Sequence, residues 1–373
     1  MAAVTQKSVM LAAGGTGGHL FPAFALAQEL GRRSIAVDLV TDMRGDRYGA
    51  NFPARAIYRV PSATLASRSL VAAIGTALML TRGVAAAFKL LGQVKPRAVV
   101  GFGGYPAFPP LVAAYLRRIP TALHEQNAVL GRANRMLAKR VSAIATSFEH
   151  TKYLEGPALA RARLTGNPVR DEVIDGATQS YRAPGSNGPF SLLVFGGSQG
   201  ARFFSDALPP ALALLPPPLR ASLFVVQQCR EEDLARVEEA YKDSGVRAHL
   251  ATFFANLPEE MAKCHLVIGR AGASTVAELA VMGRPAILVP LPHAIDDDQL
   301  GNAKQLAESG GAWCLEQQQL TPDRLAEAIS RLLTSPEALG QAAAAIKRHG
   351  RPDAVSLLAN LVEELVGNKA KTA

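Results

Sequence analysis

Short apolar runs alternate with longer amphipathic stretches along the chain of 373 residues. The runs have the length and composition of buried strands, and apolar residues recur at helical spacing between them. The predicted strands are residues 9–13, 36–40, 98–101, 121–124, 143–146, 192–195, 222–227, 266–269 and 286–290. Predicted helices include residues 21–31, 107–118 and 275–283. This alternation predicts the α/β class, with doubly wound parallel sheets that bind ligands at the carboxyl ends of their strands.

A turn-rich segment, residues 179–189, divides this pattern into two halves. Each half opens with its own strand and glycine-rich turn, and the chain is longer than one typical core. We therefore predict two Rossmann-like domains that face each other across a cleft, residues 1–166 and residues 167–352. A final amphipathic helix begins near residue 353, and we expect residues 353–373 to pack back on the first domain.

Three glycine clusters, residues 14–18, 101–104 and 196–200, each follow a predicted strand. Glycine lets backbone N–H groups approach a ligand closely, and the N-terminus of a following helix attracts anions. A dinucleotide fingerprint is excluded because Leu20 stands where its third glycine belongs, and no cluster ends in the Gly-Lys-Ser/Thr of a P-loop. The clusters therefore predict a diphosphate site made of backbone amides and hydroxyls.

The formal net charge of +9 suits nucleic acid, an anionic membrane surface or a polyanionic substrate. Nucleic acid is disfavoured because aromatic residues make up only 6% of the chain, and neither zinc-ligand spacing nor a basic recognition helix is present in the sequence. The three cysteines, Cys229, Cys264 and Cys314, are widely spaced and favour a reducing cytosol.

Neither a signal peptide nor a membrane span is expected from the sequence. The first strand begins too early to leave room for a signal peptide. The apolar stretch at residues 69–81 is closed by Arg82, short of the roughly 20 residues that a span requires. We expect a soluble or peripheral protein.

Seven motifs that span nearly the whole chain resemble those of the MurG family of peptidoglycan N-acetylglucosaminyltransferases, in the same order. They are residues 14–22, 101–107, 124–127, 166–170, 196–202, 270–278 and 299–303. The most specific are His-Glu-Gln-Asn at 124–127 and Gly-Gly-Ser-Gln-Gly-Ala at 196–201. The resemblance implies a glycosyltransferase fold of the B type and an inverting transfer from UDP-N-acetylglucosamine.

The resemblance also implies the acceptor and the location. The acceptor is the C4 hydroxyl of N-acetylmuramoyl-pentapeptide linked to undecaprenyl diphosphate, and transfer makes the second lipid intermediate of cell-wall synthesis. The location is the cytoplasmic side of the inner membrane, where the enzyme is peripheral and contacts anionic lipid.

The resemblance assigns binding residues to the glycine loops and the motifs beside them. The residues implied to bind the donor are Thr16, Gly17, Gly18, Asn127, Arg170, Ser198, Phe254, Ala273, Ser274, Thr275, Val276, Ala277, Glu278 and Gln299. Glu278 can accept both hydroxyls of a ribose, and Phe254 is implied to read uracil largely through its backbone. Gly103, Gly104 and Tyr105 are implied to form the acceptor and diphosphate loops.

Three residues are candidates for the general base. His19 comes first because it ends the first glycine loop and an unperturbed histidine titrates near neutrality. Glu125 is the second candidate and His124 the third, and the sequence does not rank them securely. Two other functions stay open: a UDP-N-acetylglucosamine epimerase, and a nucleotide-sugar sensor without transfer activity. His19, Tyr105 and residues 124–127 argue against the sensor.

An acidic run, Asp296-Asp297-Asp298, precedes Gln299. Asp296 and Asp298 formally match the D-x-D pattern that chelates a divalent metal in other glycosyltransferases. The alternative is an acidic loop at the N-terminus of the next helix. We favour the acidic loop, because amides, a helix dipole and Arg170 already serve the phosphates, and we expect neither a metal nor a cofactor.

The segment 65–91 is the candidate membrane-docking surface. At about 100° per residue, one broad helical arc holds Leu70, Ile74, Leu78, Val84 and Phe88. A basic flank beside it holds Arg68, Arg82 and Lys89. Interfacial helices combine such faces on anionic lipid. The alternative is that the apolar arc packs into the first domain's core, and the implied lipid substrate favours docking.

Overall fold

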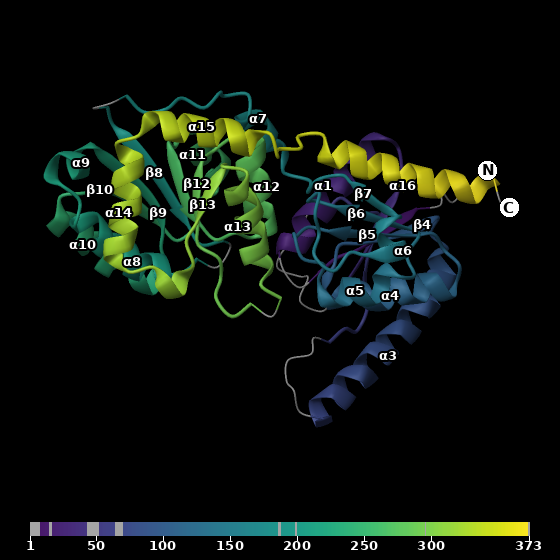
Figure 1. The fold of residues 1–373 in the computed structure, drawn as a ribbon. Coiled ribbons are helices and arrows are strands. Elements are labelled where there is room, and N and C mark those ends of the chain that lie inside the picture. Colours follow the sequence, from purple (N-terminus) through teal and green to yellow (C-terminus); the bar gives the residue numbers. More distant parts are fainter. Residues whose placement is uncertain are drawn as a thin grey trace. The chain divides into compact units, whose positions relative to one another are not determined.

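The computed structural model describes residues 8–14, 17–42, 52–63, 70–185, 188–197, 200–294 and 296–371. The chain forms two compact units (Figure 1). Unit 1 comprises Met1–Val169 and Pro352–Ala373, and unit 2 comprises Arg170–Arg351. Each unit is an α/β domain built on one parallel sheet, which confirms the predicted fold class.

The sheet of unit 1 has the strand order β3-β2-β1-β4-β5-β6-β7, and all its pairs are parallel. The strands are β1 (Val9–Ala12), β2 (Val37–Thr41), β3 (Ala56–Arg59), β4 (Ala98–Gly101), β5 (Thr121–Glu125), β6 (Ala143–Thr146) and β7 (Ala162–Leu164). The order reverses between β1 and β4, which are neighbours. The loops that follow these two strands, both glycine-rich, therefore leave the same edge of the sheet side by side.

Helices cover both faces of this sheet. One face packs on α1 (Gly17–Arg32) and the C-terminal helix α16 (Ala354–Lys371). The other packs on α3 (Leu70–Val94), α4 (Gly104–Leu116) and α5 (Arg132–Ala138), and the short α6 (Gly156–Leu159) contributes Ala158 to the same core. Helix α1 begins at Gly17, inside the first glycine cluster and earlier than the predicted start at residue 21.

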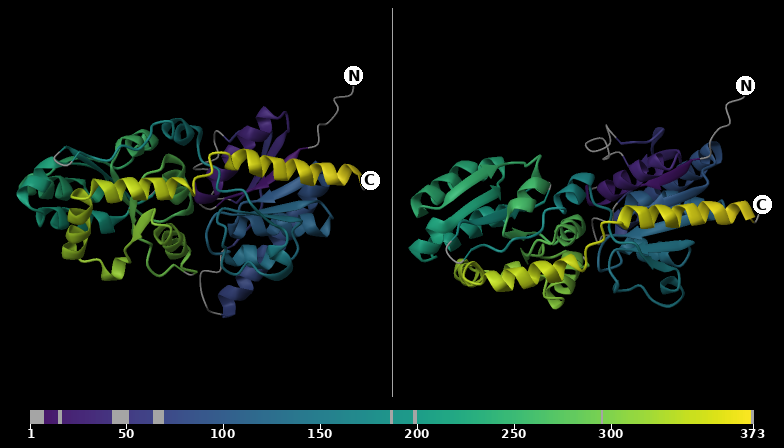
Figure 2. Two further views of the ribbon diagram at one scale, coloured as in Figure 1. Left: turned by 45° about the horizontal axis from the view of Figure 1, so that its top comes forward. Right: turned by 90° about the horizontal axis from the view of Figure 1, so that it is seen from above.

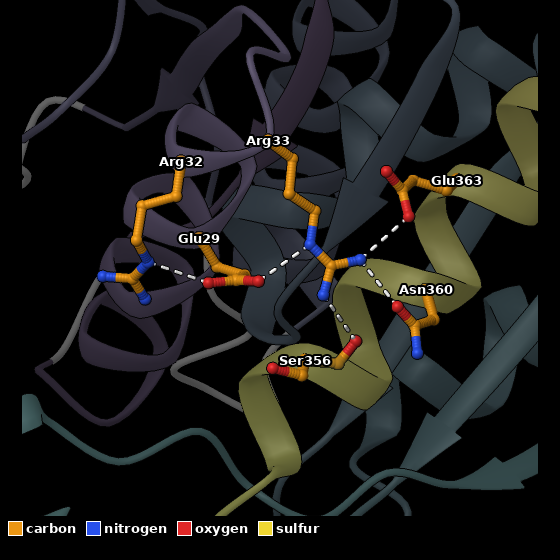
Figure 3. A network of polar contacts seen from close by, with 6 residues as sticks. All are labelled: Glu29, Arg32, Arg33, Ser356, Asn360 and Glu363. Carbon is orange, nitrogen blue, oxygen red and sulfur yellow. Dashed lines mark hydrogen bonds and ion pairs between the residues drawn. The ribbon is translucent and has the colours of Figure 1, made fainter.

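The C-terminal helix α16 lies along α1 and completes the core of unit 1 with Leu358, Ala359 and Val362. A polar network joins the two helices at the surface (Figure 3). Arg33 Nη1 donates to Asn360 Oδ1 at 2.6 Å and pairs with Glu363 Oε2 at 2.8 Å, while its Nε bonds Glu29 Oε1. Residues separated by the whole of unit 2 in the sequence thus share one core.

Unit 2 is built on a parallel sheet with the order β10-β9-β8-β11-β12-β13. Its strands are β8 (Phe190–Phe195), β9 (Leu223–Gln228), β10 (Arg247–Ala251), β11 (Leu266–Gly269), β12 (Ala286–Leu288) and β13 (Ala312–Cys314). Its helices are α7 (Asp171–Gly176), α8 (Arg202–Ala213), α9 (Pro217–Ser222), α10 (Leu234–Ser244), α11 (Leu257–Lys263), α12 (Ala273–Met282), α13 (Asp298–Glu308), α14 (Pro322–Leu333) and α15 (Pro336–Lys347), with 3-10 turns η1 (Glu231–Asp233) and η2 (Gln317–Gln319). Figure 2 shows the sheet of each unit from two further sides.

Helix α3 covers the described part of the candidate docking segment, residues 65–91, and continues to Val94 with Arg82 and Lys89 exposed. Arg82 closes the uncharged stretch at residues 69–81 but does not end the helix, which is therefore longer than that stretch. Within the described part of the chain, α3 is the one helix whose length and composition would let it cross a membrane, over Ile74–Val94. Its packed side carries Gly83, where a side chain would clash with Pro61 O, so α3 approaches that backbone closely.

Candidate functional site

The first part of the site lies in unit 1, where the loops after β1, β4 and β5 meet. Gly15 and Thr16 lie outside the described residues, so the prediction for Thr16 stays a prediction. Gly17 opens α1, Gly18 is exposed, and His19 is half-buried one residue further on. Helix α4 begins at Gly104, and no side chain caps its N-terminus.

The His19 ring packs against the second glycine cluster. A Cβ added to Gly104 would lie 3.2 Å from His19 Cε1, and a Cβ added to Gly103 would lie 3.5 Å from His19 Cδ2. Gly103 and Gly104 have positive φ angles of 82° and 68°, a backbone conformation that would be strained in a residue with a side chain. Glycine is therefore required here for two reasons: it allows the turn, and it leaves room for the imidazole ring of His19.

The Glu125 carboxylate is 1% exposed and is bound within its own loop. Its Oε1 accepts from the backbone N–H of Asn127 at 3.0 Å, and its Oε2 accepts from the backbone N–H of Gly131 at 3.0 Å and from Asn134 Nδ2 at 2.6 Å. Burial raises the pKa of Glu125, and these hydrogen bonds oppose that rise. The carboxylate thus ties β5 to the start of α5, and it fixes Asn127 beside it.

His124 is fully buried, and both ring nitrogens are engaged. Its Nε2 donates to Gly166 O at 3.0 Å, and its Nδ1 accepts from Gln126 Nε2 at 3.1 Å. Gln126 Nε2 also donates to Phe102 O at 2.9 Å, in the second glycine loop. Burial lowers the pKa of His124 to about 4, and the charge of His19 acts in the same direction. His124 is therefore neutral near pH 7 and holds the loops in place.

The second part of the site lies in unit 2, where β11 ends and α12 begins. Helix α12 starts at Ala273 after the N-cap Gly272, and no side chain caps it. The Ser274 hydroxyl is buried and has no hydrogen-bond partner among the described residues. Ser274, Thr275 and Ala277 are half-buried, and Val276 is buried. Unsatisfied N–H groups and an unsatisfied hydroxyl at a helix N-terminus suit an anion.

Glu278 and Arg170 form an ion pair in unit 2. Glu278 Oε1 accepts from Arg170 Nε at 3.1 Å and from Nη2 at 3.0 Å. Burial raises the pKa of Glu278, and the positive charge of Arg170 lowers it. The two residues were predicted to have separate donor contacts, on the ribose and on the phosphates. The structure instead shows the two side chains bonded to each other, so a ligand that contacted both would bind at a preformed ion pair.

Gln228 was missed in the sequence prediction, and it joins two loops of unit 2. Its Oε1 accepts from Gly196 N at 3.1 Å, in the third glycine cluster, and its Nε2 donates to Thr252 O at 3.2 Å. Phe254, in the second of these loops, is buried against the His249 ring. Ser198 lies outside the described residues, and its role stays a prediction. The only sequence signal for Gln228 is a polar residue at the carboxyl end of an apolar strand.

Gln299 connects α13 to the loop that precedes the helix, because its Oε1 accepts a hydrogen bond from the backbone N–H of Leu291 at 3.1 Å. Asp298 Oδ1 accepts from the N–H of Gln299 at the start of the helix, as expected for an acidic residue at a helix N-terminus. Arg270 reaches the same segment, because its Nη1 donates to Val289 O and Pro290 O. Within the described ranges, no group of three or more His, Cys, Asp and Glu side chains could hold a metal ion.

The low pKa of His124 predicts a pH dependence of stability. An unfolded histidine titrates near 6.5, so the unfolded state binds a proton that the folded state rejects between pH 6.5 and pH 4. The free energy of unfolding should therefore fall by about 3 kcal/mol as the pH drops through this window. Urea unfolding of the wild type and of His124→Gln at several pH values measures the difference. Equal pH slopes for both proteins would contradict the prediction.

Comparison with known proteins identifies the chain's relatives. The glycosyltransferase family 28 N-terminal domain model matches residues 9–146, and the C-terminal domain model matches residues 191–358. Two curated relatives carry the name UDP-N-acetylglucosamine–N-acetylmuramyl-(pentapeptide) pyrophosphoryl-undecaprenol N-acetylglucosamine transferase. The protein from Mesorhizobium japonicum is 51% identical over 97% of this chain and 96% of its own length. The protein from a Methylobacterium strain is 53% identical over 97% of both.

Solved structures agree with this result. MurG from Acinetobacter baumannii superimposes with a TM-score of 0.80 and 30% identity, covering 96% of this chain and 99% of that one. A UDP-N-acetylglucosamine 2-epimerase from Neisseria meningitidis has a TM-score of 0.66 at 14% identity, over 95% of this chain and all of its own, and shares the fold alone. The chain belongs to glycosyltransferase family 28 and, within it, to the MurG group of N-acetylglucosaminyltransferases.

Proposed function

We propose that this protein transfers N-acetylglucosamine from UDP-N-acetylglucosamine to the C4 hydroxyl of undecaprenyl-diphosphate-linked N-acetylmuramoyl-pentapeptide, with inversion at the anomeric carbon. The proposal rests on the sequence identity of this chain, about 50% over nearly the full length, to transferases named for this reaction. The epimerase alternative is not favoured, because its solved representative has only 14% identity to this chain. The product feeds peptidoglycan synthesis, and hence cell shape and division.

The donor-binding role is assigned to unit 2. The uncapped N-terminus of α12 and the Ser274 hydroxyl would hold the diphosphate, and they would stabilise the charge that develops on departing UDP. Glu278 would accept the ribose hydroxyls. Because Arg170 already donates to Glu278 Oε1, it would lie close to the bound nucleotide.

The acceptor-binding role is assigned to unit 1, with His19 as the general base. Glu125 and His124, the other candidates, are buried and hydrogen-bonded within their own loops. His19 is half-buried and lies beside Gly103 and Gly104, so it would take the proton of an acceptor hydroxyl bound at the second glycine cluster. Gly103, Gly104 and Tyr105 would bind the acceptor diphosphate at the uncapped start of α4.

The membrane-docking role is assigned to α3. Its Ile74, Leu78 and Phe88 side chains are 62%, 51% and 40% exposed, with Arg82 and Lys89 exposed as well. The opposite side of the helix, with Gly83, Ala87 and Leu91, is buried. The exposed apolar face with basic residues beside it would lie on the anionic cytoplasmic surface of the inner membrane, so that the enzyme is peripheral.

A transfer assay tests the proposal directly. Purified protein is incubated with radiolabelled UDP-N-acetylglucosamine and a short-chain analogue of the lipid acceptor, and the lipid fraction is extracted. Label in the lipid fraction, dependent on the acceptor, supports the transferase. Epimerised UDP-sugar formed without acceptor would support the epimerase, and nucleotide-sugar binding without either product would support the sensor.

Replacing Glu278 should weaken donor binding. A hydrogen bond to a charged group contributes about 1.5–3 kcal/mol, so Glu278→Ala should raise the KM for UDP-N-acetylglucosamine by about tenfold or more. Steady-state kinetics measure this, with circular dichroism to verify folding. Glu327→Ala, at an exposed acid of α14, is the matched control and should leave KM unchanged. An unaltered KM in Glu278→Ala would remove the ribose assignment.

Replacing His19 should affect the chemical step. If His19 is the base, His19→Ala should lower kcat by roughly 10²–10⁴-fold with little change in the donor KM. His150→Ala, which changes an exposed histidine of the same unit, serves as the control and should retain full activity. A loss of less than tenfold in His19→Ala would show that the proton is taken elsewhere.

Charging the exposed face of α3 should weaken membrane binding. Because Leu78 is half-exposed, Leu78→Glu should stay folded. A leucine that is buried in the membrane contributes about 1.5–3 kcal/mol to binding, so its loss should reduce binding to anionic vesicles about tenfold or more. Vesicle sedimentation at several salt concentrations measures binding. Leu214→Glu, at an exposed leucine of unit 2, is the control. Undiminished sedimentation of Leu78→Glu would exclude α3 as the docking surface.

A further inference from the structure

A second apolar feature of unit 1 lies between α4 and α5, which pack against each other, and α4 also packs against α3 (Figure 1). It is a groove of about 340 Å³, a size at the lower end of ligand-binding pockets. Phe108, Val112 and Leu116 line it from α4, and Met136 lines it from α5. Leu116 and Met136 are exposed to solvent, 58% and 54%. No carboxylate is among its lining residues in the described structure.

The groove begins close to the acceptor loops and leads away from them. Helix α4 starts at Gly104, in the second glycine cluster. With a rise of 1.5 Å per residue, Phe108 lies about 6 Å along the helix from Gly104, and Leu116 about 18 Å. Helix α5 starts beside this cluster, because its Asn134 Nδ2 lies 3.2 Å from the position that a Cβ on Gly103 would take. A chain attached to a diphosphate at Gly104 therefore meets the groove within one helical turn.

The positive charges near the groove lie at its far end, away from Gly104. Its polar lining residues are Tyr115 and Arg140, and the neighbouring Lys139 is exposed. At the end of α4, Arg117 lies over the Phe88 ring at 3.8 Å and donates from Nε to Phe88 O. Phe88 belongs to the exposed apolar face of α3, so the end of α4, where Leu116 lines the groove, contacts the proposed membrane-docking surface through Arg117.

We propose that this groove binds the first isoprene units of the acceptor's polyprenyl chain, between the diphosphate at the second glycine cluster and the membrane. The inference rests on the proposed function, since it requires a lipid-linked acceptor. The groove keeps the proximal part of the chain out of water once the diphosphate leaves the bilayer surface. It thereby contributes to acceptor affinity in proportion to the length of chain that it can cover.

Filling the groove tests this proposal. Met136→Trp enlarges an exposed side chain in the groove, and Leu159→Trp makes the same kind of change at an equally exposed position, 54%, outside it. Transfer is measured in one detergent with two synthetic acceptors, one carrying a single isoprene unit and one carrying seven. Met136→Trp should raise the KM for the long acceptor by about tenfold or more, the usual discrimination of an apolar pocket. The KM for the short acceptor and for the donor should not change.

The controls separate the groove from the alternatives. Leu159→Trp should behave as wild type with both acceptors, and Leu116→Glu should reproduce the loss by placing a charge in the groove. An unchanged KM for the long acceptor in both groove variants would overturn the proposal. So would weaker sedimentation with anionic vesicles at an unchanged KM in detergent, because the groove would then bind bulk membrane lipid. If the wild type transfers to neither acceptor, the proposed function itself fails, which is a distinct result.

Discussion

The loops that follow β1, β4 and β5 in unit 1 depend on one buried carboxylate. Among the described residues no cation pairs with Glu125, so its hydrogen bonds from Asn127, Gly131 and Asn134 must replace water. Satisfying that group fixes the loop after β5 and the start of α5. The same loop positions Gln126, which holds Phe102 and thus the second glycine cluster, against which His19 packs. A charge that cannot move makes the surrounding polypeptide rigid.

Unit 2 achieves a similar result with neutral amides. Gln228 bridges the third glycine cluster to the loop after β10, and Gln299 bridges the start of α13 to Leu291. An amide has both a donor and an acceptor, so it can join two backbone segments without adding a charge. The positive ends of the helix dipoles are then left for the ligand. Arg170 and Glu278 form an ion pair at the same site, and under the proposed function both groups would face the nucleotide.

The strands that could be predicted from the sequence are those that are apolar along their whole length because both of their faces are buried. Strands β1, β4, β8 and β11 are almost wholly buried apolar runs, and all nine predicted strands are present. Strands β3, β7 and β10 were missed because each is an edge strand and only half-buried, and the edge strand β13 has three residues. Asn134 and Gln228 could not be recognised, since an amide side chain acquires its role only when tertiary structure supplies its partners. The partnership of Arg170 and Glu278, 108 residues apart, has the same origin.

The position of α16 has a consequence for how the chain is made. Its Leu358, Ala359 and Val362 belong to the core of unit 1, yet the ribosome adds them after every residue of unit 2. Unit 2 is one continuous segment and can fold as soon as it emerges, whereas the apolar side of α1 waits uncovered. Unit 1, whose synthesis begins first, is therefore the last of the two units to complete its core. During that interval the nascent protein exposes a hydrophobic stripe of the kind that chaperones bind.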